Sequence, residues 1–523
     1  MSQADVIIVG GGPTGITAGL ILGRYGVKTV IFDKLKDIFP HPRAAVFDDD
    51  IARVYQTASV AEDVLKVTAP SKGYQFLDQE NNVMFSFKRT ADRTLHGYPT
   101  SLVIRQPEVE EQLRKGLSKF ESVSFYPNHE VIALEQTDTH VIVTVKDNDT
   151  KEEKKYEAKY LLAADGANST IREIVGIERD DFGFQHPWFI LDVKAPNGLN
   201  VTNINQQFCH PKRPCTFLYL GNNWYRFEIA LLEGESQSTY KTDEQIKELL
   251  SNWIDTSDIE IDRRIVYVFR SRIAKARKSG RVFLIGDAAH QMPPFLGQGL
   301  SSGARDAANI AWKIAHVLQH NVKEDILDTY ESERLPHVKK IIQQAVQLGE
   351  IIQTDNQEIA DFRDRLFKFL NGIPNVSEAL HNLQRSMSPI GEGFFHPSLD
   401  GKDYLPFPQP VVTLANGSEE KLDDVLGLGF ALVASKYVNN TKFNQLKEKV
   451  EQLGLGKFLK CIHLVDDTPA NSDEVKEEAA MLDDWFNNNR VDVAIVRPDH
   501  YVYAKTSADQ AEAILEDLKN ALL

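Results

Sequence analysis

Apolar positions near the start of the chain change their spacing at a cluster of glycines. Residues 6–15 read VIIVGGGPTG, and the run from Val6 to Val9 is typical of a buried strand. From Thr14 to Leu22 the apolar residues recur at helical spacing instead, so the pattern predicts a strand, a turn and a helix. Residues 6–23 carry no charge. A signal peptide or membrane span is nevertheless not expected, because the glycines and Pro13 would interrupt such a helix.

The glycines of this turn have the spacing of a dinucleotide-binding loop. Gly10, Gly12 and Gly15 form G-x-G-x-x-G, which provides a tight turn, close approach of a pyrophosphate, and packing of the helix on the strand. A second apolar strand ends at Asp33, where an acid can accept hydrogen bonds from an adenosine ribose. The residues expected to contact the dinucleotide here are Gly10, Gly12, Pro13, Thr14, Gly15, Asp33 and Lys34. This loop alone leaves open whether the dinucleotide is FAD or NAD.

Farther along the chain the pattern predicts sheet first and then helix. Residues 140–163 predict a hairpin with a charged, solvated tip. Residues 182–232 alternate as in a sheet and are rich in aromatic rings, most of them expected in the core and the rest around an apolar pocket. A long helical pattern from Leu327 to about Thr354 contains Pro336, which we expect to kink or break it. The proline-rich stretch YLPFPQP, residues 404–410, then marks a linker.

A separate pattern occupies roughly the last 120 residues. It consists of the strand FALVAS, a helix near 441–453, the strand CIHLVD, a helix near 475–487, the hairpin VDVAIVRPDHYVYAK and a final helix. This order is thioredoxin-like. Cys461 has no partner thiol, so dithiol chemistry is excluded. We expect this unit to dock onto the first domain or to form a dimer contact.

Composition narrows the classes of partner. At 523 residues, 42% hydrophobic and 26% charged, the chain is globular and long enough for two or three domains. Its net charge of −16 disfavours nucleic acid and anionic membrane as partners. The three cysteines form neither a CxxC pair nor a disulfide framework, which is typical of the cytoplasm. We find no metal-ligand spacing, and nothing separates a monomer from a homodimer.

Two later segments carry the most specific motifs. In YLLAADGANSTIR, residues 160–172, an apolar strand runs into Asp165 and Gly166. In RVFLIGDAAHQMPPFLGQGL, residues 281–300, another strand ends at Gly286 and Asp287, before a proline-stiffened loop and a helix. With HPRAAVFDDD and IRQPEVEEQL upstream, these motifs resemble the single-component (group A) flavoprotein aromatic hydroxylases, which have the para-hydroxybenzoate hydroxylase fold. The resemblance covers about residues 4–350 and is strongest to the 3-(3-hydroxyphenyl)propionate and phenol hydroxylase-like groups.

The resemblance implies FAD as the bound dinucleotide. There is no second G-x-G-x-x-G for a separate nicotinamide domain, so NADH or NADPH is expected to visit the same flavin. In the family, backbone N–H groups at the start of the helix after residue 296 face the flavin, where a helix N-terminus stabilises negative charge. The further FAD contacts that the resemblance implies are Arg43, Arg105, Gln106, Asp165, Gly166, Gly286, Asp287, Pro294, Gly297, Gly299 and Leu300.

The implied reaction is hydroxylation of a phenolic ring with NAD(P)H and O2 through a flavin C4a-hydroperoxide. The resemblance makes Asp48 the candidate for activating the phenol and places the Pro293 carbonyl near the reacting ring. The alternative for Asp48, Asp49 and Asp50 is a helix N-terminal turn, where the dipole favours acids. His290 either shapes its loop or relays a proton.

A small aromatic substrate is expected, with a carboxylated phenol preferred. Arg213 and Arg226 match positions in the hydroxyphenylpropionate group, where an arginine can hold a carboxylate through two parallel hydrogen bonds. Tyr219 is a third candidate substrate contact. The alternative for either arginine is a salt bridge at a strand edge, for instance with Glu228.

The predicted fold is α/β: a Rossmann-type FAD-binding domain with an inserted β-sheet substrate domain, followed by a thioredoxin-like α/β domain. The predicted boundaries are residues 1–180 and 265–354 for the FAD-binding domain, 181–264 for the substrate domain, 355–400 for a helical connector and 401–523 for the last domain. Two other functions stay open, namely hydroxylation of a polycyclic natural product and flavin binding without turnover.

Overall fold

The strand, turn and helix expected at the start of the chain form the centre of a parallel sheet in the computed structural model, which describes residues 2–89, 94–201, 203–374, 376 and 389–523. The sheet has the order β19, β20, β13, β2, β3, β9, and only β19 is antiparallel. Its strands are β2 (Val6–Val9), β3 (Thr29–Asp33), β9 (Val123–Pro127), β13 (Tyr160–Ala163), β19 (Lys278–Ser279) and β20 (Val282–Leu284). The carboxyl ends of its parallel strands therefore share one edge, where ligands bind in open α/β sheets.

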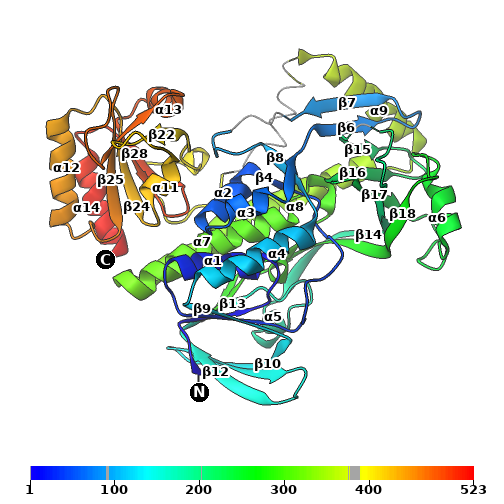
Figure 1. The fold of residues 1–523 in the computed structure, drawn as a ribbon, viewed down its shortest axis with the longest axis horizontal. Coiled ribbons are helices and arrows are strands. Elements are labelled where there is room, and N and C mark those ends of the chain that lie inside the picture. The colour runs from blue at the N-terminus through cyan, green and yellow to red at the C-terminus, as the bar shows by residue number, and fades with distance from the viewer. Residues whose placement is uncertain (1, 90–93, 202, 375, 377–388) are drawn as a thin grey trace.

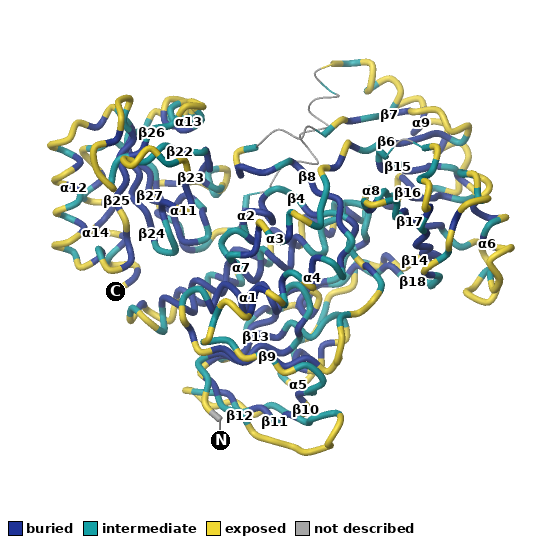
Figure 2. Tube along the Cα trace, viewed as in Figure 1, coloured by how far each residue is buried: buried dark blue, intermediate teal, exposed yellow. Residues whose placement is uncertain are grey.

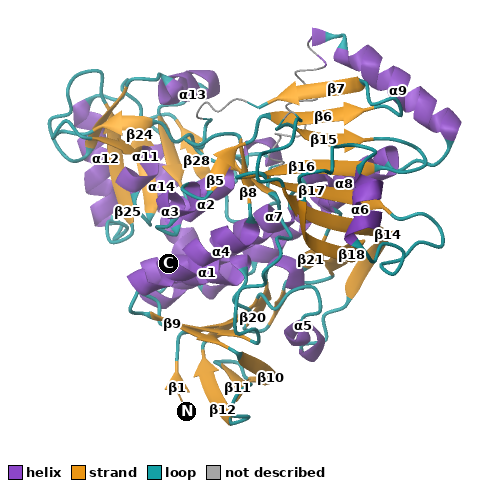
Figure 3. Cartoon of the chain, turned by 45° about the vertical axis from the view of Figure 1, so that its right-hand side comes forward, coloured by secondary structure: helices purple, strands orange, loops and turns teal. Residues whose placement is uncertain are grey.

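Both faces of this sheet are covered, which explains the unbroken apolar run in β2. Val6 and Ile8 pack into a core with the helices, whereas Ile7 and Val9 pack on the opposite face against a second sheet. Helices α1 (Pro13–Arg24) and α7 (Gly299–His320) lie together on the first face (Figure 1). The second sheet, below the first in Figure 3, contains β1 (Ser2–Gln3), β12 (Glu153–Ala158), β11 (Val141–Asp147) and β10 (His129–Gln136).

An eight-stranded sheet forms the other large layer. In spatial order its strands are β21 (His290–Gln291), β18 (Glu260–Ala274), β14 (Arg179–Lys194), β17 (Trp224–Ala230), β16 (Cys215–Gly221), β15 (Asn205–Phe208), β6 (Gly73–Leu77) and β7 (Val83–Lys88). The sheet is thus built from more than the predicted segment 181–264, because β6 and β7 come from the first hundred residues. A small sheet of β4 (Val46–Asp48), β8 (Ser101–Ile104) and β5 (Thr68–Pro70) lies between this layer and the helices.

Helices complete the first two layers. They are α2 (Asp49–Thr57), α3 (Ala61–Leu65), α4 (Gln106–Gly116), α5 (Thr170–Ile174), α6 (Asp243–Leu250), α8 (Thr329–Ile352) and α9 (Gln357–Asn371). The expected break at Pro336 does not occur, since α8 continues through it. Pro336 is exposed, whereas Val338, Ile342 and Ala345 lie on the buried face of the helix. Packing of the buried face therefore offsets the hydrogen bond that proline cannot make. The predicted connector 355–400 lies partly outside the described residues.

The C-terminal domain has the expected thioredoxin-like order. Its sheet runs β23 (Glu419–Lys421), β22 (Val411–Thr413), β26 (Glu474–Glu477), β25 (Leu459–Leu464), β24 (Phe430–Ala434), β27 (Val493–Val496), β28 (Val502–Thr506). Its helices are α11 (Leu422–Leu426), α12 (Asn440–Gln452), α13 (Met481–Asn489) and α14 (Ala511–Leu522). The helix expected near 475–487 was misplaced: residues 474–477 form a strand, and the helix begins at Met481.

Buried residues fill the interior of this domain and that of the first domain (Figure 2), and one core continues from one to the other. One core runs from β2 and α1 through α7, including Trp312, to Phe430 and Leu432 of β24. The predicted docking onto the first domain is therefore present. Within the described residues, no helix combines the length and apolar character needed to cross a membrane.

Candidate active site

Three glycines of the first turn meet very different surroundings. Gly10 has φ +108°, and a Cβ there would lie 2.2 Å from the Ala164 carbonyl oxygen. A Cβ on Gly15 would lie 2.0 Å from the Gly10 carbonyl oxygen, whereas one on Gly12 would meet no atom within 4 Å. Packing of the protein itself therefore requires Gly10 and Gly15, and Gly12 keeps space open for a ligand.

Asp33 lies at the carboxyl end of β3 and holds this turn. Its carboxylate accepts hydrogen bonds from the backbone N–H of Gly11 at 2.7 Å and of Leu35 at 2.8 Å. Each carboxylate oxygen can accept more than one hydrogen bond, so this geometry is compatible with a ribose contact. The neighbouring Lys34 is exposed and lies outside the cavity described next.

A cavity of about 650 Å³ starts at this turn and continues beneath the eight-stranded sheet. No side chain caps the starts of α1 and α7, and both lie at its edge. Free N–H groups at two helix starts and open space at Gly12 suit an anionic diphosphate and a reduced flavin. The predicted FAD contacts that line the cavity are Gly12, Pro13, Thr14, Arg43, Gln106, Gly166, Asp287, Pro294, Gly297, Gly299 and Leu300.

Other predicted FAD contacts shape the walls from behind. The Gln106 side-chain oxygen accepts hydrogen bonds from the backbone N–H groups of Arg43 (3.0 Å) and Ala44 (2.7 Å), so it fixes this loop as well as lining the cavity. The Arg105 guanidinium lies 4.0 Å above the Trp224 ring. Asp165 accepts from the Ser169 hydroxyl and the Ile171 N–H, which closes the turn before α5. Predicted contacts not lining the cavity are Gly10, Gly15, Asp33, Lys34, Arg105, Asp165 and Gly286.

Asp306 on α7 is a site residue that the sequence interpretation missed. Fully buried, it pairs with Arg277 (3.0 Å) and Arg334 (2.8 Å), and it also accepts the Gly286 N–H (3.1 Å) and contacts His290 Nε2 (2.8 Å). Burial by itself raises the pKa of Asp306, but the two arginines and His290 outweigh burial and hold it well below its usual range. The signal in the sequence was a charged residue within the helix that follows the proline-stiffened loop.

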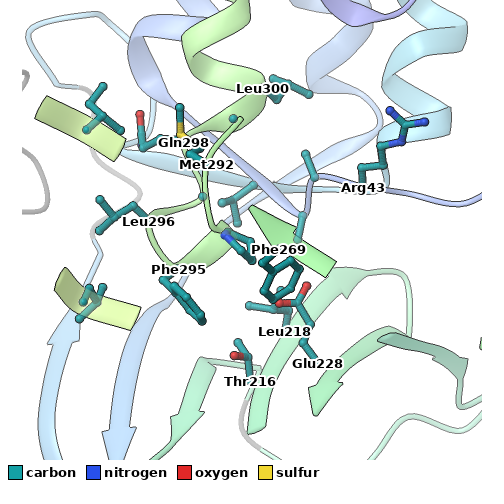
Figure 4. Close-up of a pocket in the computed structure, with 18 of the residues that line it drawn as sticks. Arg43, Thr216, Leu218, Glu228, Phe269, Met292, Phe295, Leu296, Gln298 and Leu300 are labelled. Carbon is teal, nitrogen blue, oxygen red and sulfur yellow. The ribbon is translucent and has the colours of Figure 1, made fainter. Parts of the chain in front are cut away.

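The far end of the cavity is apolar, with a few polar groups (Figure 4). Such a chamber suits an aromatic ring. Its apolar walls are formed by Tyr74, Phe76, Phe85, Ile190, Leu218, Phe269, Phe295, Leu296, Leu348 and Phe367. Thr216, Glu228 and Asn205 are polar groups on its sheet side. Pro293 is buried and does not itself line the cavity, although its neighbours Met292 and Pro294 do.

Asp48 reaches the cavity between the flavin side and the small sheet. Its carboxylate accepts a hydrogen bond from Gln298 Nε2 at 2.5 Å and lies 3.8 Å from Arg305. Burial raises the pKa of Asp48, and Arg89 opposes that shift. Asp50 makes the stronger pair with Arg305, at 2.6 and 3.0 Å. The acidic triplet thus does lead into helix α2, and Asp48 also faces the cavity.

The three predicted substrate contacts are not brought together. Arg213 pairs with Glu235 at 2.8 and 2.9 Å and lies outside the cavity. Tyr219 packs on the opposite face of β16, because strand side chains alternate and Leu218 faces the cavity. Arg226 lines the cavity, but it donates to Asp192 (2.7 and 3.1 Å) and to two backbone carbonyls. A two-bond grip on a substrate carboxylate is not available there without displacing these partners.

Comparison with known families agrees with this geometry. A family model described as FAD binding domain matches residues 3–345, and one described as HcaD C-terminal domain matches residues 406–521. The chain belongs to this FAD-binding domain family. It is an FAD-dependent aromatic hydroxylase, as the sequence motifs predicted.

Particular relatives support this class, and solved structures share the fold. The chain is 31% identical to a 3-(3-hydroxy-phenyl)propionate/3-hydroxycinnamic acid hydroxylase of Burkholderia cenocepacia, over 97% of this chain and 94% of the relative. It is 29% identical to one of the same name from Comamonas testosteroni, over 99% and 97%. The flavin-dependent monooxygenase PieE, solved with FAD and substrate, has a similar fold with a TM-score of 0.83, at 18% identity and 99% coverage of both chains. OxyS anhydrotetracycline hydroxylase from Streptomyces rimosus gives a TM-score of 0.78, at 21% identity and 99% coverage of both.

Proposed function

We propose that this chain hydroxylates a phenol with an acidic side chain, consuming NADH or NADPH and O2. The observation that carries the proposal is a single cavity that joins the glycine turn and the start of α7 to an aromatic chamber under the eight-stranded sheet. The substrate class is supported by the relatives named for 3-(3-hydroxyphenyl)propionate and 3-hydroxycinnamic acid. Arg43, Arg89 and Arg270 also line the cavity, and their charge favours an anionic substrate.

The roles of the protein in this reaction are positioning and exclusion of water. FAD, when bound, supplies hydride acceptance and activation of dioxygen. Gly12 and Thr14 would hold its diphosphate at the start of α1, and the backbone from Gly297 to Leu300 would face the flavin. Apolar side chains such as Phe269 and Phe295 enclose the ring and keep water away from the reaction, which limits loss of the activated oxygen as peroxide.

The sequence resemblance made Asp48 the candidate for activating the phenol; we now propose it as a polar contact at the flavin side of the substrate. Its support is its place in the cavity wall and its hydrogen bond to Gln298, the residue before α7. The Pro293 carbonyl remains a proposed contact on the same side. Arg226 contributes by holding the loop at Pro42 and Arg43, which borders both halves of the cavity.

A coupled turnover screen tests the function. Purified holoenzyme is assayed for NADH and NADPH oxidation with monocyclic phenols, hydroxyphenyl acids and polycyclic phenols, and products are analysed by mass. We expect 3-(3-hydroxyphenyl)propionate or a similar acid to stimulate oxidation most and to gain one oxygen atom. Stimulation by polycycles alone would contradict the substrate class, and oxidation without oxygenated product from any phenol would contradict hydroxylation.

A further inference from the structure

Glu228 places a carboxyl group on the wall of the aromatic chamber. It lies on β17 with Ile190 of β14 and Thr216 of β16 as its cross-strand neighbours, and all three residues line the cavity. Figure 4 draws its carboxylate beside Leu218 and Phe269. Glu228 is only 6% exposed, so its polar partners must come from the protein or from a ligand.

The protein supplies Glu228 with no hydrogen bond among the described residues. The nearest cation is Arg226, whose NH1 lies 3.9 Å from the carboxylate, beyond hydrogen-bond distance. Arg226 instead pairs with Asp192 at 2.7 Å, and Arg263 also lies nearest to Asp192, at 3.5 Å. Both arginines thus lie closer to Asp192 than to Glu228, and the Glu228 carboxylate lines the chamber.

The surroundings also bring the pKa of this carboxyl group close to neutral pH. Burial raises the pKa of Glu228 to about 7, with Asp192 adding to the shift and Arg226 and Arg263 opposing it. Of the neighbouring titratable groups, Tyr74 of β6 lines the same cavity, and burial raises its pKa. Cys215 of β16 lies on the opposite face of the sheet, and burial raises its pKa as well. A base with its pKa near the working pH is suited to proton transfer.

We propose that Glu228 is a catalytic residue that takes the proton from the substrate hydroxyl. The phenol O–H bond breaks and an O–H bond forms on the Glu228 carboxylate, while the electron pair stays on the phenolic oxygen and makes the ring more nucleophilic. The assignment rests on the proposed function. It places the substrate hydroxyl against β17, on the sheet side of the chamber, and leaves Asp48 as a contact on the flavin side.

The test compares Glu228→Gln with Asp48→Asn on two phenols. One is the best substrate from the turnover screen, and the other is a ring-fluorinated analogue of it that is already ionised at the assay pH. In the wild type, hydroxylation should increase as pH rises through about 7, because only the carboxylate form accepts a proton. Glu228→Gln should lose this dependence and fall about 100-fold on the ordinary phenol, but less than about tenfold on the ionised analogue.

Other outcomes separate the possible failures. Glu235→Gln, the same change outside the cavity, should keep the wild-type pH profile. An equal loss by Glu228→Gln on both phenols would show a structural role and overturn the assignment, as would rescue of Asp48→Asn by the ionised analogue. Binding of FAD and thermal unfolding of each variant verify its fold. If the wild type hydroxylates no phenol, the proposed function is wrong. If the wild type is active and Glu228→Gln behaves like it, the function stands and only the role of Glu228 is wrong.

Discussion

Gly10 and Gly12 are two residues apart and serve different purposes. Gly10 has a positive φ and lies against the Ala164 carbonyl, with no room for a Cβ. Gly12 lines the cavity, and a Cβ there would meet no atom within 4 Å. Both appear identically in the sequence motif, since G-x-G-x-x-G records only the absence of a side chain. The surrounding atoms distinguish a glycine required for folding from one required for a ligand.

Alanine at each position separates the two roles. Gly10→Ala should destabilise the fold by at least about 2 kcal/mol, because strain at positive φ adds to a clash with backbone. Gly12→Ala should unfold like the wild type but bind FAD about 10- to 100-fold more weakly, because its methyl group occupies the space of the diphosphate. Thermal unfolding of the apoprotein and FAD titration measure the two effects. Normal FAD affinity in Gly12→Ala would contradict the placement of the diphosphate.

At the scale of elements, α7 organises the flavin side of the site through one acid. Asp306 connects this helix to the Gly286 turn, to Arg334 of α8 and to His290 of β21. His290 lines the cavity, and this charged partner holds its ring from behind the cavity wall. Apolar spacing predicted the helix but not these bonds, because their partners are separated from Asp306 by up to 29 residues in the chain.

Replacing Asp306 tests this arrangement. Asp306→Asn should lower the free energy of unfolding by about 3–5 kcal/mol at pH 7, because Arg277 and Arg334 stay buried without their counter-charge. The folded-state pKa of Asp306 is depressed, so its stabilisation is present above the usual Asp range and is lost as pH falls. The difference between variant and wild type should therefore shrink in acid. Urea unfolding at several pH values measures it, with exposed Asp325→Asn as the neutral comparison.

At the scale of the whole molecule, the C-terminal domain is joined to the FAD-binding domain by buried charges as well as by core. Arg53 of α2 donates to Asp423 of α11 at 2.6 and 2.7 Å, and both side chains are almost fully buried. Arg497 makes a similar pair with Glu333 of α8. With Phe430 in the same core as Trp312, the two domains should unfold together.

Breaking one of these pairs tests the cooperativity. Asp423→Asn should lower the free energy of unfolding by about 3–5 kcal/mol, since it leaves the Arg53 charge unpaired. Its exposed neighbour provides the control, as Asp424→Asn should change stability by less than about 0.5 kcal/mol. Calorimetry should show a single transition for the wild type. Separate melting of the last domain, with no effect of Asp423→Asn on the first, would contradict a joined unit.

The sequence by itself determined the order of elements and the dinucleotide-binding loop, through apolar runs and glycine spacing. FAD and the class of enzyme followed from the resemblance of its motifs, such as the G-D turn at Gly286 and Asp287, to a known family. Two predictions from the local pattern were wrong. The helix does not break at Pro336, because packing of its buried face keeps α8 continuous. The residues near 475 form a strand instead of a helix, because they pair with β25.

Only the tertiary structure decided which side chains face the substrate. Strand alternation places the side chain of Leu218 in the cavity and that of Tyr219 on the opposite face of β16. Arg213 forms an ion pair with Glu235 outside the cavity. Arg226 pairs with Asp192 at 2.7 Å and lies 3.9 Å from Glu228, whose carboxylate lines the chamber. Such choices depend on charge pairing and desolvation among residues far apart in the chain, and a linear pattern does not contain those energies.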